Sequence, residues 1–247
     1  MSESQEDSFI SHLVELRDRL LRAVVAVVVI FVCLMPWAGD IYDILAHPMM
    51  SALPEGTKMI ATGVVTPFFV PMKVTLLVAF VIALPFVLYQ AWCFIAPGLY
   101  VHEKRLGLPL VVGSTVLFLA GMAFCYFFVF GTVFKFIAQF APKIITPAPD
   151  IEQYLAFVMS MFLAFGITFE VPVIVIVLVK LGIVDVAKFK EARLYVIVGA
   201  FVIAAVVTPP DVVSQLMLAV PMCLLYELGI FLSRFVTKTR ADEAVSS

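Results

Sequence analysis

The sequence predicts an all-α, polytopic membrane protein with six transmembrane helices and both termini in the cytoplasm. Hydrophobic residues make up 63% of the 247 residues and charged residues only 14%, and the mean hydropathy is +1.11. Soluble domains average roughly 45–50% apolar and about 25% charged residues, so one soluble core could not bury this much apolar surface. Several long stretches contain no Asp, Glu, Lys or Arg: 23–39, 74–101, 106–134, 194–210 and 212–226.

The predicted helices follow from these stretches, because about 20 apolar residues in a helix span a bilayer core about 30 Å thick. An amphipathic helix over 8–21, with Leu13, Leu16 and Leu20 on one side, is expected to follow the membrane surface into the first span. The fourth span requires one acid, Glu170, inside it. One integral membrane domain over 1–247 therefore contains spans at 22–38, 74–98, 106–134, 153–179, 194–208 and 212–233, and a flexible tail at 234–247.

The connections between the spans carry proline and capping signals. The first outer loop, 39–73, contains four prolines and an apolar stretch at 41–45 that predicts a short helix capping the bundle. Asp150 and Asp211 are predicted N-caps of the fourth and sixth helices. The fifth span has about 15 residues and covers roughly 22 Å, so its hairpin is expected to end below the outer surface or to thin the bilayer.

The distribution of basic residues predicts the orientation. Twelve of the 16 Lys and Arg residues fall in the two terminal segments and in the loops 99–105 and 180–193. Cytoplasmic loops carry such an excess of basic residues, so the termini and these two loops are expected to be cytoplasmic.

Several function classes lack their usual motifs. The sequence has no GxxxxGK[ST] phosphate loop, no HExxH and no GxSxG, and its three histidines lie far apart. We therefore expect no metal, no cofactor, no nucleic-acid partner and no enzymatic activity. The two halves show no convincing repeat, which weakens an inverted-repeat transporter.

The polar residues near the cytoplasmic surface allow two interpretations. Glu15 either forms an ordinary i,i+4 pair with Arg19 or receives a cationic ligand. Glu103 follows the helix break at Pro97 and is either neutralised by the basic residues beside it or held ready, like Glu15, to bind a guanidinium through two parallel hydrogen bonds. Phe94 is either an ordinary packing aromatic or part of the same surface.

Two further polar positions lie within or between spans. Glu170 falls near mid-membrane, where a charge costs about 2.5–3.5 kcal/mol on insertion scales, and Pro172 removes a helical hydrogen bond beside it. Glu170 is either a protonated structural residue or a contact for a partner helix or a water-filled cavity. Thr208, Asp211 and Gln215 mark a polar hairpin tip, which is either a simple cap or a docking edge for another helix.

The chain closely resembles the TatC family, the multi-spanning core of the bacterial twin-arginine protein translocase. The resemblance rests on SHLVELRDRL, AHPM at 46–49, FIAPGLYVHEKR, AFGITFEVPV and TPPDVVSQ. It implies a concave, glove-like bundle in the cytoplasmic (inner) membrane, in contact with lipid. It also implies that the protein binds twin-arginine signal peptides and, with TatA and TatB, moves folded proteins using the proton-motive force. We further expect a homo-oligomer within the receptor complex.

The same resemblance assigns roles to residues. It places the signal-recognition surface at Glu15, Arg17, Phe94 and Glu103, an intramembrane polar contact at Glu170, the partner-helix contact at Thr208, Asp211 and Gln215, and a structural role in the outer cap at Pro48. One position departs from the family pattern, because Thr66 precedes Pro67 where many members have an acid. The alternative from another class is a small-solute or proton-coupled secondary transporter with Glu170 as the proton carrier.

Overall fold

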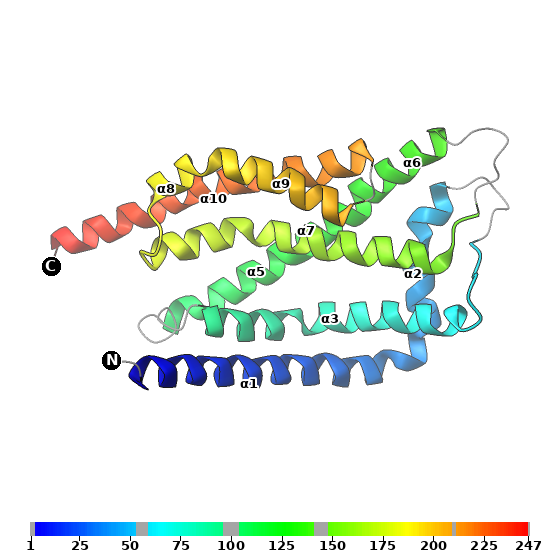
Figure 1. The fold of residues 1–247 in the computed structure, drawn as a ribbon, viewed down its shortest axis with the longest axis horizontal. Coiled ribbons are helices and arrows are strands. Elements are labelled where there is room, and N and C mark those ends of the chain that lie inside the picture. Colours follow the sequence, from blue (N-terminus) through cyan, green and yellow to red (C-terminus); the bar gives the residue numbers. More distant parts are fainter. Residues whose placement is uncertain (1–2, 53–58, 96–103, 141–147, 209–210, 247) are drawn as a thin grey trace.

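Helices make up nearly all of the chain that the computed structural model describes, which is residues 3–52, 59–95, 104–140, 148–208 and 211–246. In Figure 1, the long helices α1, α3, α7 and α10 run lengthwise, α5 and α6 cross them diagonally, and α2 lies across one end. The elements are α1 (Glu3–Leu34), η1 (Met35–Trp37), α2 (Ala38–Ala52), α3 (Thr66–Ile95), α5 (Lys104–Phe124), η2 (Cys125–Val129), α6 (Phe130–Phe140), α7 (Ile151–Lys180), α8 (Val186–Glu191), α9 (Arg193–Val207) and α10 (Val212–Ser246).

The apolar helices confirm the predicted fold class. Within the described residues, five stretches are long and apolar enough to cross a membrane: His12–His47, Thr66–Ile95, Gly107–Ile137, Ile151–Lys180 and Val212–Arg234. The shorter apolar helix α9 supplies the sixth span. Figure 1 shows that α1 starts and α10 finishes at the same end of the molecule, here called the terminal end, as an even number of spans requires.

Helices extend further into the first outer loop than the sequence predicted. The short helix expected at 41–45 is α2, which covers Ala38–Ala52, and the second span begins at Thr66 rather than near 74. The prolines did not prevent this, because Pro67 lies in the first turn of α3, where its missing N–H needs no helical partner. Pro71 lies further inside α3, and its carbonyl accepts a 2.8 Å bond from the Thr75 hydroxyl.

Helix α10 extends beyond the predicted end of the sixth span, whereas α9 matches its prediction. Within the segment 234–247, predicted as a flexible tail, α10 continues to Ser246. No proline or glycine occurs after Gly229 to end the helix. Helix α9 has 15 residues, about 22 Å at 1.5 Å per residue. In Figure 1, α9 ends and α10 begins short of the end opposite the termini, which agrees with the predicted shallow hairpin.

Helix α7 lies at the centre of the packing. It contacts α10, α5 and α3, and its side chains Val158, Met161 and Phe165 are fully buried in the main apolar core. The helix ends where Gly182 adopts φ 72°, a left-handed conformation that glycine takes without steric cost. Outside this core, α1 packs on α3 and leaves most of its apolar side chains exposed, as a lipid-facing helix does.

Polar contacts connect the outer loop to the start of α7 at the end opposite the termini. Ile60 pairs with the backbone on both sides of Asp150, through bonds of 3.0 Å to the Pro149 carbonyl and 2.9 Å from the Ile151 amide. Asp150 is the predicted N-cap of α7, and its Oδ1 accepts from the Glu152 and Gln153 amides at 2.9 and 3.1 Å. These bonds fix the outer loop at Ile60 relative to the start of α7.

Acid is expected to loosen this connection. The Thr62 hydroxyl and amide donate to Asp150 Oδ2 at 2.7 and 3.1 Å. The Thr62 hydrogen bond, with those from the α7 amides, holds the pKa of Asp150 below its usual value. A lowered pKa stabilises the fold above the unfolded-state pKa, and this contribution disappears as the pH falls through the folded-state pKa. The melting temperature in detergent should change little between about pH 5 and 8 and fall below about pH 4.

The matched variant for this prediction is Asp150→Asn, which keeps an oxygen for the N-cap but cannot titrate. Its melting temperature should fall less on acidification than that of the wild type. An equal acid-induced fall in both proteins would show that other carboxyl groups carry the effect.

Candidate functional site

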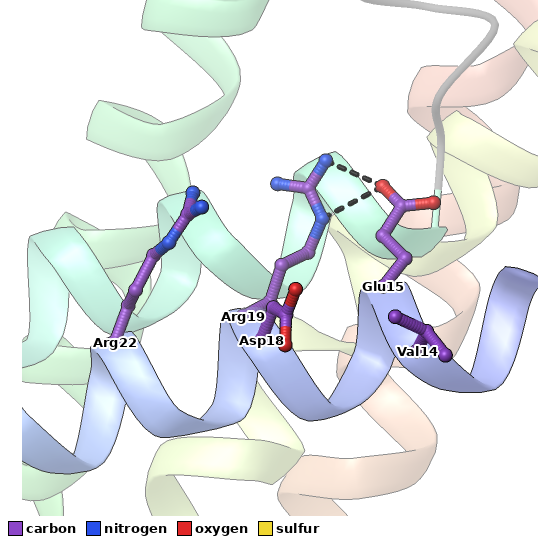
Figure 2. A pocket seen from close by; sticks show the side chains of 5 residues that line it. All are labelled: Val14, Glu15, Asp18, Arg19 and Arg22. Atoms are coloured by element: carbon purple, nitrogen blue, oxygen red, sulfur yellow. Dashed lines mark hydrogen bonds and ion pairs between the residues drawn. The ribbon is translucent and has the colours of Figure 1, made fainter.

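The terminal end carries a hollow of about 310 Å³ on the first helix. Figure 2 shows its lining side chains, with Glu15, Arg19 and Arg22 rising from successive turns of α1 and Val14 and Asp18 beside them. Residues at i, i+4 and i+7 share one face of a helix, so the three long side chains lie in a row. The hollow therefore combines two carboxylates, Glu15 and Asp18, with two guanidinium groups.

The Glu15 carboxylate already holds a guanidinium. Arg19 Nε and Nη2 donate to the same oxygen, Glu15 Oε1, at 2.8 and 2.6 Å. Arg19 Nη1 also reaches Gln90 Oε1 on α3 at 3.5 Å. The Arg19 side chain is 24% exposed and that of Glu15 40%, so the pair lies partly between the two helices. The simple i,i+4 pair allowed by the sequence is therefore present.

Arg17, another predicted recognition residue, lies differently. Its guanidinium donates to the neighbouring Asp18 Oδ1 at 3.0 and 2.9 Å, and its side chain is 67% exposed. An exposed pair of this kind contributes little to stability. The Arg17 guanidinium therefore remains accessible at the surface.

Phe94, near the end of α3, packs against α1 at His12. Its ring stacks on the imidazole of His12, with the ring centroids 4.3 Å apart and the planes 18° apart. His12 precedes Glu15 by three residues, so both lie on one side of α1. The structure thus brings Phe94 close to Glu15 through His12. Glu103, the second predicted recognition acid, lies outside the described residues.

Glu170 lies in the interior, where α3, α5 and α7 meet. It is 6% exposed, and no described group makes a hydrogen bond of good geometry to either carboxylate oxygen. Ser114 on α5 is near enough to interact, and its oxygen accepts a 2.9 Å bond from the Trp92 indole. Apolar side chains pack around Trp92, including Val173 and Val177 on α7. Glu170 is therefore a buried acid with unmet bonding capacity.

The α9–α10 hairpin presents a second set of unmet polar atoms. Asp211 caps the start of α10, as the sequence predicted, and its Oδ1 accepts from the Ser214 amide at 2.7 Å. Its Oδ2 and the Ser214 hydroxyl are buried, and no described group bonds to either. Thr208 ends α9 and donates to the Ala204 carbonyl at 2.7 Å, while Gln215 is half-buried one turn into α10.

The predicted residues thus occupy separate regions. Glu15, Arg17 and Phe94 lie together at the terminal end, Glu170 is interior, and the hairpin residues form a third group. Pro48 lies within α2, and its side chain is outside the part of the chain that the structure describes. Sequence reasoning missed four contact partners: His12, Gln90, Trp92 and Ser114. Polar side chains inside apolar spans were the available signal for Gln90 and Ser114, since such groups need partners in a membrane.

The helices and these polar sites define a multi-pass membrane protein with an accessible charged surface at one end. Comparison with known proteins narrows this class. A family model described as Sec-independent protein translocase protein (TatC) matches residues 11–221. The TatC protein of Escherichia coli (strain K12) is 50% identical over 235 residues, which cover 95% of this chain and 91% of the relative. The TatC protein of Aquifex aeolicus is 39% identical over 94% of this chain and 96% of its own.

A solved structure agrees with this match. A crystal structure described as the twin arginine translocase receptor TatC superposes with a TM-score of 0.81 at 40% identity, covering 92% of this chain and 99% of that chain. The chain belongs to the TatC family. It is accordingly a transport protein of the membrane, a component of a Sec-independent protein translocase.

Proposed function

We propose that the protein is the signal-recognition subunit of its translocase and binds twin-arginine signal peptides at the terminal end. The observation that carries the proposal is the Glu15 carboxylate, which accepts two N–H groups of a guanidinium at the surface. A site that binds one guanidinium in this way has the chemistry to bind another. The exposed hollow beside it leaves room for an incoming arginine.

The neighbouring groups support a peptide ligand. The His12–Phe94 stack provides an apolar surface next to the acid, which suits the side chains that flank a signal peptide's arginines. The excess of basic residues near both termini favours a cytoplasmic terminal end in the bacterial inner membrane. Glu103, five residues after Gly98 in the sequence, is proposed as the second acid because of the family resemblance.

The polar residues of the α9–α10 hairpin and Glu170 are suited to contacts with partner subunits. Asp211 Oδ2 and Ser214 Oγ lack described partners at the hairpin tip, and a polar side chain on a TatA or TatB helix could satisfy them beside Thr208 and Gln215. Glu170 would meet the signal peptide or a partner helix inside a concave face. In this role the protein assembles with TatA, TatB and further copies of itself, and the proton-motive force drives export of folded proteins.

Binding of a twin-arginine signal peptide to the purified protein tests the recognition role. Glu15→Gln keeps the size of the side chain but removes its charge, and we expect the peptide affinity to fall at least about tenfold, the size of one lost charge-assisted interaction. Glu103→Ala should have a similar effect, and so should replacing the peptide's two arginines by lysines. Glu227→Gln, which removes a carboxylate bonded to Arg193 on other helices, is the matched control and should bind normally.

The buried, unpartnered Glu170 favours one competing function, proton or solute transport by this chain alone. Vesicles that contain only this protein separate the two. Solute or proton flux that Glu170→Gln abolishes, together with normal peptide affinity for Glu15→Gln, would contradict the recognition role.

A further inference from the structure

Arg19 occupies the position that an arginine ligand would need at Glu15. Both of its bonds go to Oε1, at 2.8 and 2.6 Å, and among the described residues none donates to Oε2. Figure 2 shows the Arg19 guanidinium turned toward the Glu15 carboxylate. Its 24% exposure contrasts with 67% for Arg17 on the same helix.

Arg19 also has a second partner to which it can remain attached. Its Nη1 lies 3.5 Å from Gln90 Oε1 on α3, a long hydrogen bond that would shorten if the guanidinium left Glu15. Gln90 itself is 6% exposed, so this acceptor is fixed by the packing of α3. The guanidinium therefore lies between a carboxylate that it holds tightly and an amide that it holds weakly.

We propose that Arg19 is an internal competitor for the Glu15 carboxylate and that it lowers the affinity of the site for signal peptides. The inference rests on the proposed function, because it assumes that a ligand cation binds at Glu15. The incoming group must displace Arg19, which turns toward Gln90. No covalent step is involved.

Competition weakens both kinds of cation by the same factor, because each must displace the same Arg19 guanidinium. A ligand guanidinium replaces the two N–H bonds that Arg19 gives up, since its planar group offers paired donors that match a carboxylate. A lysine ammonium is a compact, strongly hydrated charge without that paired geometry, so it binds more weakly whether or not Arg19 is present. Removal of Arg19 leaves the carboxylate vacant and raises the affinity for both.

A different role for Arg19 makes the opposite prediction. If Arg19 only orients the Glu15 side chain for the ligand, its removal weakens binding of every cationic peptide. The sign of the affinity change therefore separates a competitor from a positioning residue.

The experiment measures binding of fluorescent twin-arginine and twin-lysine versions of one signal peptide to the full chain in lipid nanodiscs. We expect Arg19→Gln to bind the twin-arginine peptide about fivefold more tightly, the scale of one partly exposed ion pair. The twin-lysine peptide should gain by about the same factor, so the arginine-to-lysine affinity ratio should stay nearly unchanged. Arg19→Lys keeps the charge but loses the paired donors, and it should raise both affinities by a smaller factor.

Arg193→Gln is the matched control, because it removes one positive charge and breaks a 2.7 Å pair with Glu227 away from α1. It should leave both peptide affinities nearly unchanged, which separates competition from a general change in charge. Wild-type binding combined with weaker or unchanged binding by Arg19→Gln would overturn the competitor role alone. If neither the wild type nor Arg19→Gln bound either peptide, the recognition role and this inference would fail together.

Discussion

Replacement of Glu170 by leucine is expected to stabilise the isolated protein and to impair protein export. The carboxyl group is 6% exposed, and neither oxygen has a hydrogen bond of good geometry from a described group. A buried polar group left unsatisfied costs about 1–3 kcal/mol. Leucine has a similar volume and no polar atoms, so the free energy of unfolding should rise by about 1–3 kcal/mol.

Export should change in the opposite direction. A costly buried acid is typical of a residue that serves a function within the membrane, and a gain in stability with a loss of activity is the usual result of removing one. Thermal unfolding in detergent measures the first effect, and export of a folded twin-arginine reporter measures the second. Glu170→Gln keeps the size and most of the bonding capacity, so both effects should be smaller.

Two results would contradict this prediction. A lower melting temperature for Glu170→Leu would mean that the carboxyl group stabilises the fold, with Ser114 as the nearest candidate partner. Full export by a more stable Glu170→Leu protein would remove the proposed contact from the mechanism. The two measurements therefore test the structural and the functional role of Glu170 separately.

Much of the fold could be predicted from hydropathy, because each long apolar stretch in a membrane must form a helix that satisfies its own backbone. The ends of the helices were harder to predict. Pro67 and Pro71 lie inside α3, although prolines usually mark loops, and α10 continues past the apolar residues to Ser246. Hydropathy indicates which residues lie in the lipid, whereas a helix ends where the backbone can no longer keep its helical hydrogen bonds or helical dihedral angles.

The candidate site could be predicted in part. The i,i+4 spacing of Glu15 and Arg19 is a local pattern, and so are the N-caps Asp150 and Asp211. Contacts such as His12 with Phe94 join residues far apart in the sequence, and no periodicity within one helix specifies them. They depend on how α1 packs against α3, which the apolar pattern alone does not determine.

Alanine at Gly121 is expected to destabilise the protein, whereas alanine at Gly113 on the same helix should not. A Cβ at Gly121 would lie 2.5 Å from the Phe165 carbonyl oxygen on α7 and 2.9 Å from the Phe169 ring. A backbone oxygen cannot move aside as a flexible side chain can, so α5 and α7 would have to separate. Overpacking of this kind costs about 1–3 kcal/mol.

Gly113 provides the matched control, because nothing lies within 4 Å of its added Cβ. Alanine in place of glycine inside a helix reduces the entropy lost on folding, and Gly113→Ala should stabilise the protein by about 0.4–1 kcal/mol. Thermal unfolding of both variants in one detergent measures the difference. Equal melting temperatures would show that α5 and α7 are not as closely packed at Gly121 as the structure places them. Because Ser114 and Glu170 lie on these same two helices, a separation of α5 from α7 should also lower export.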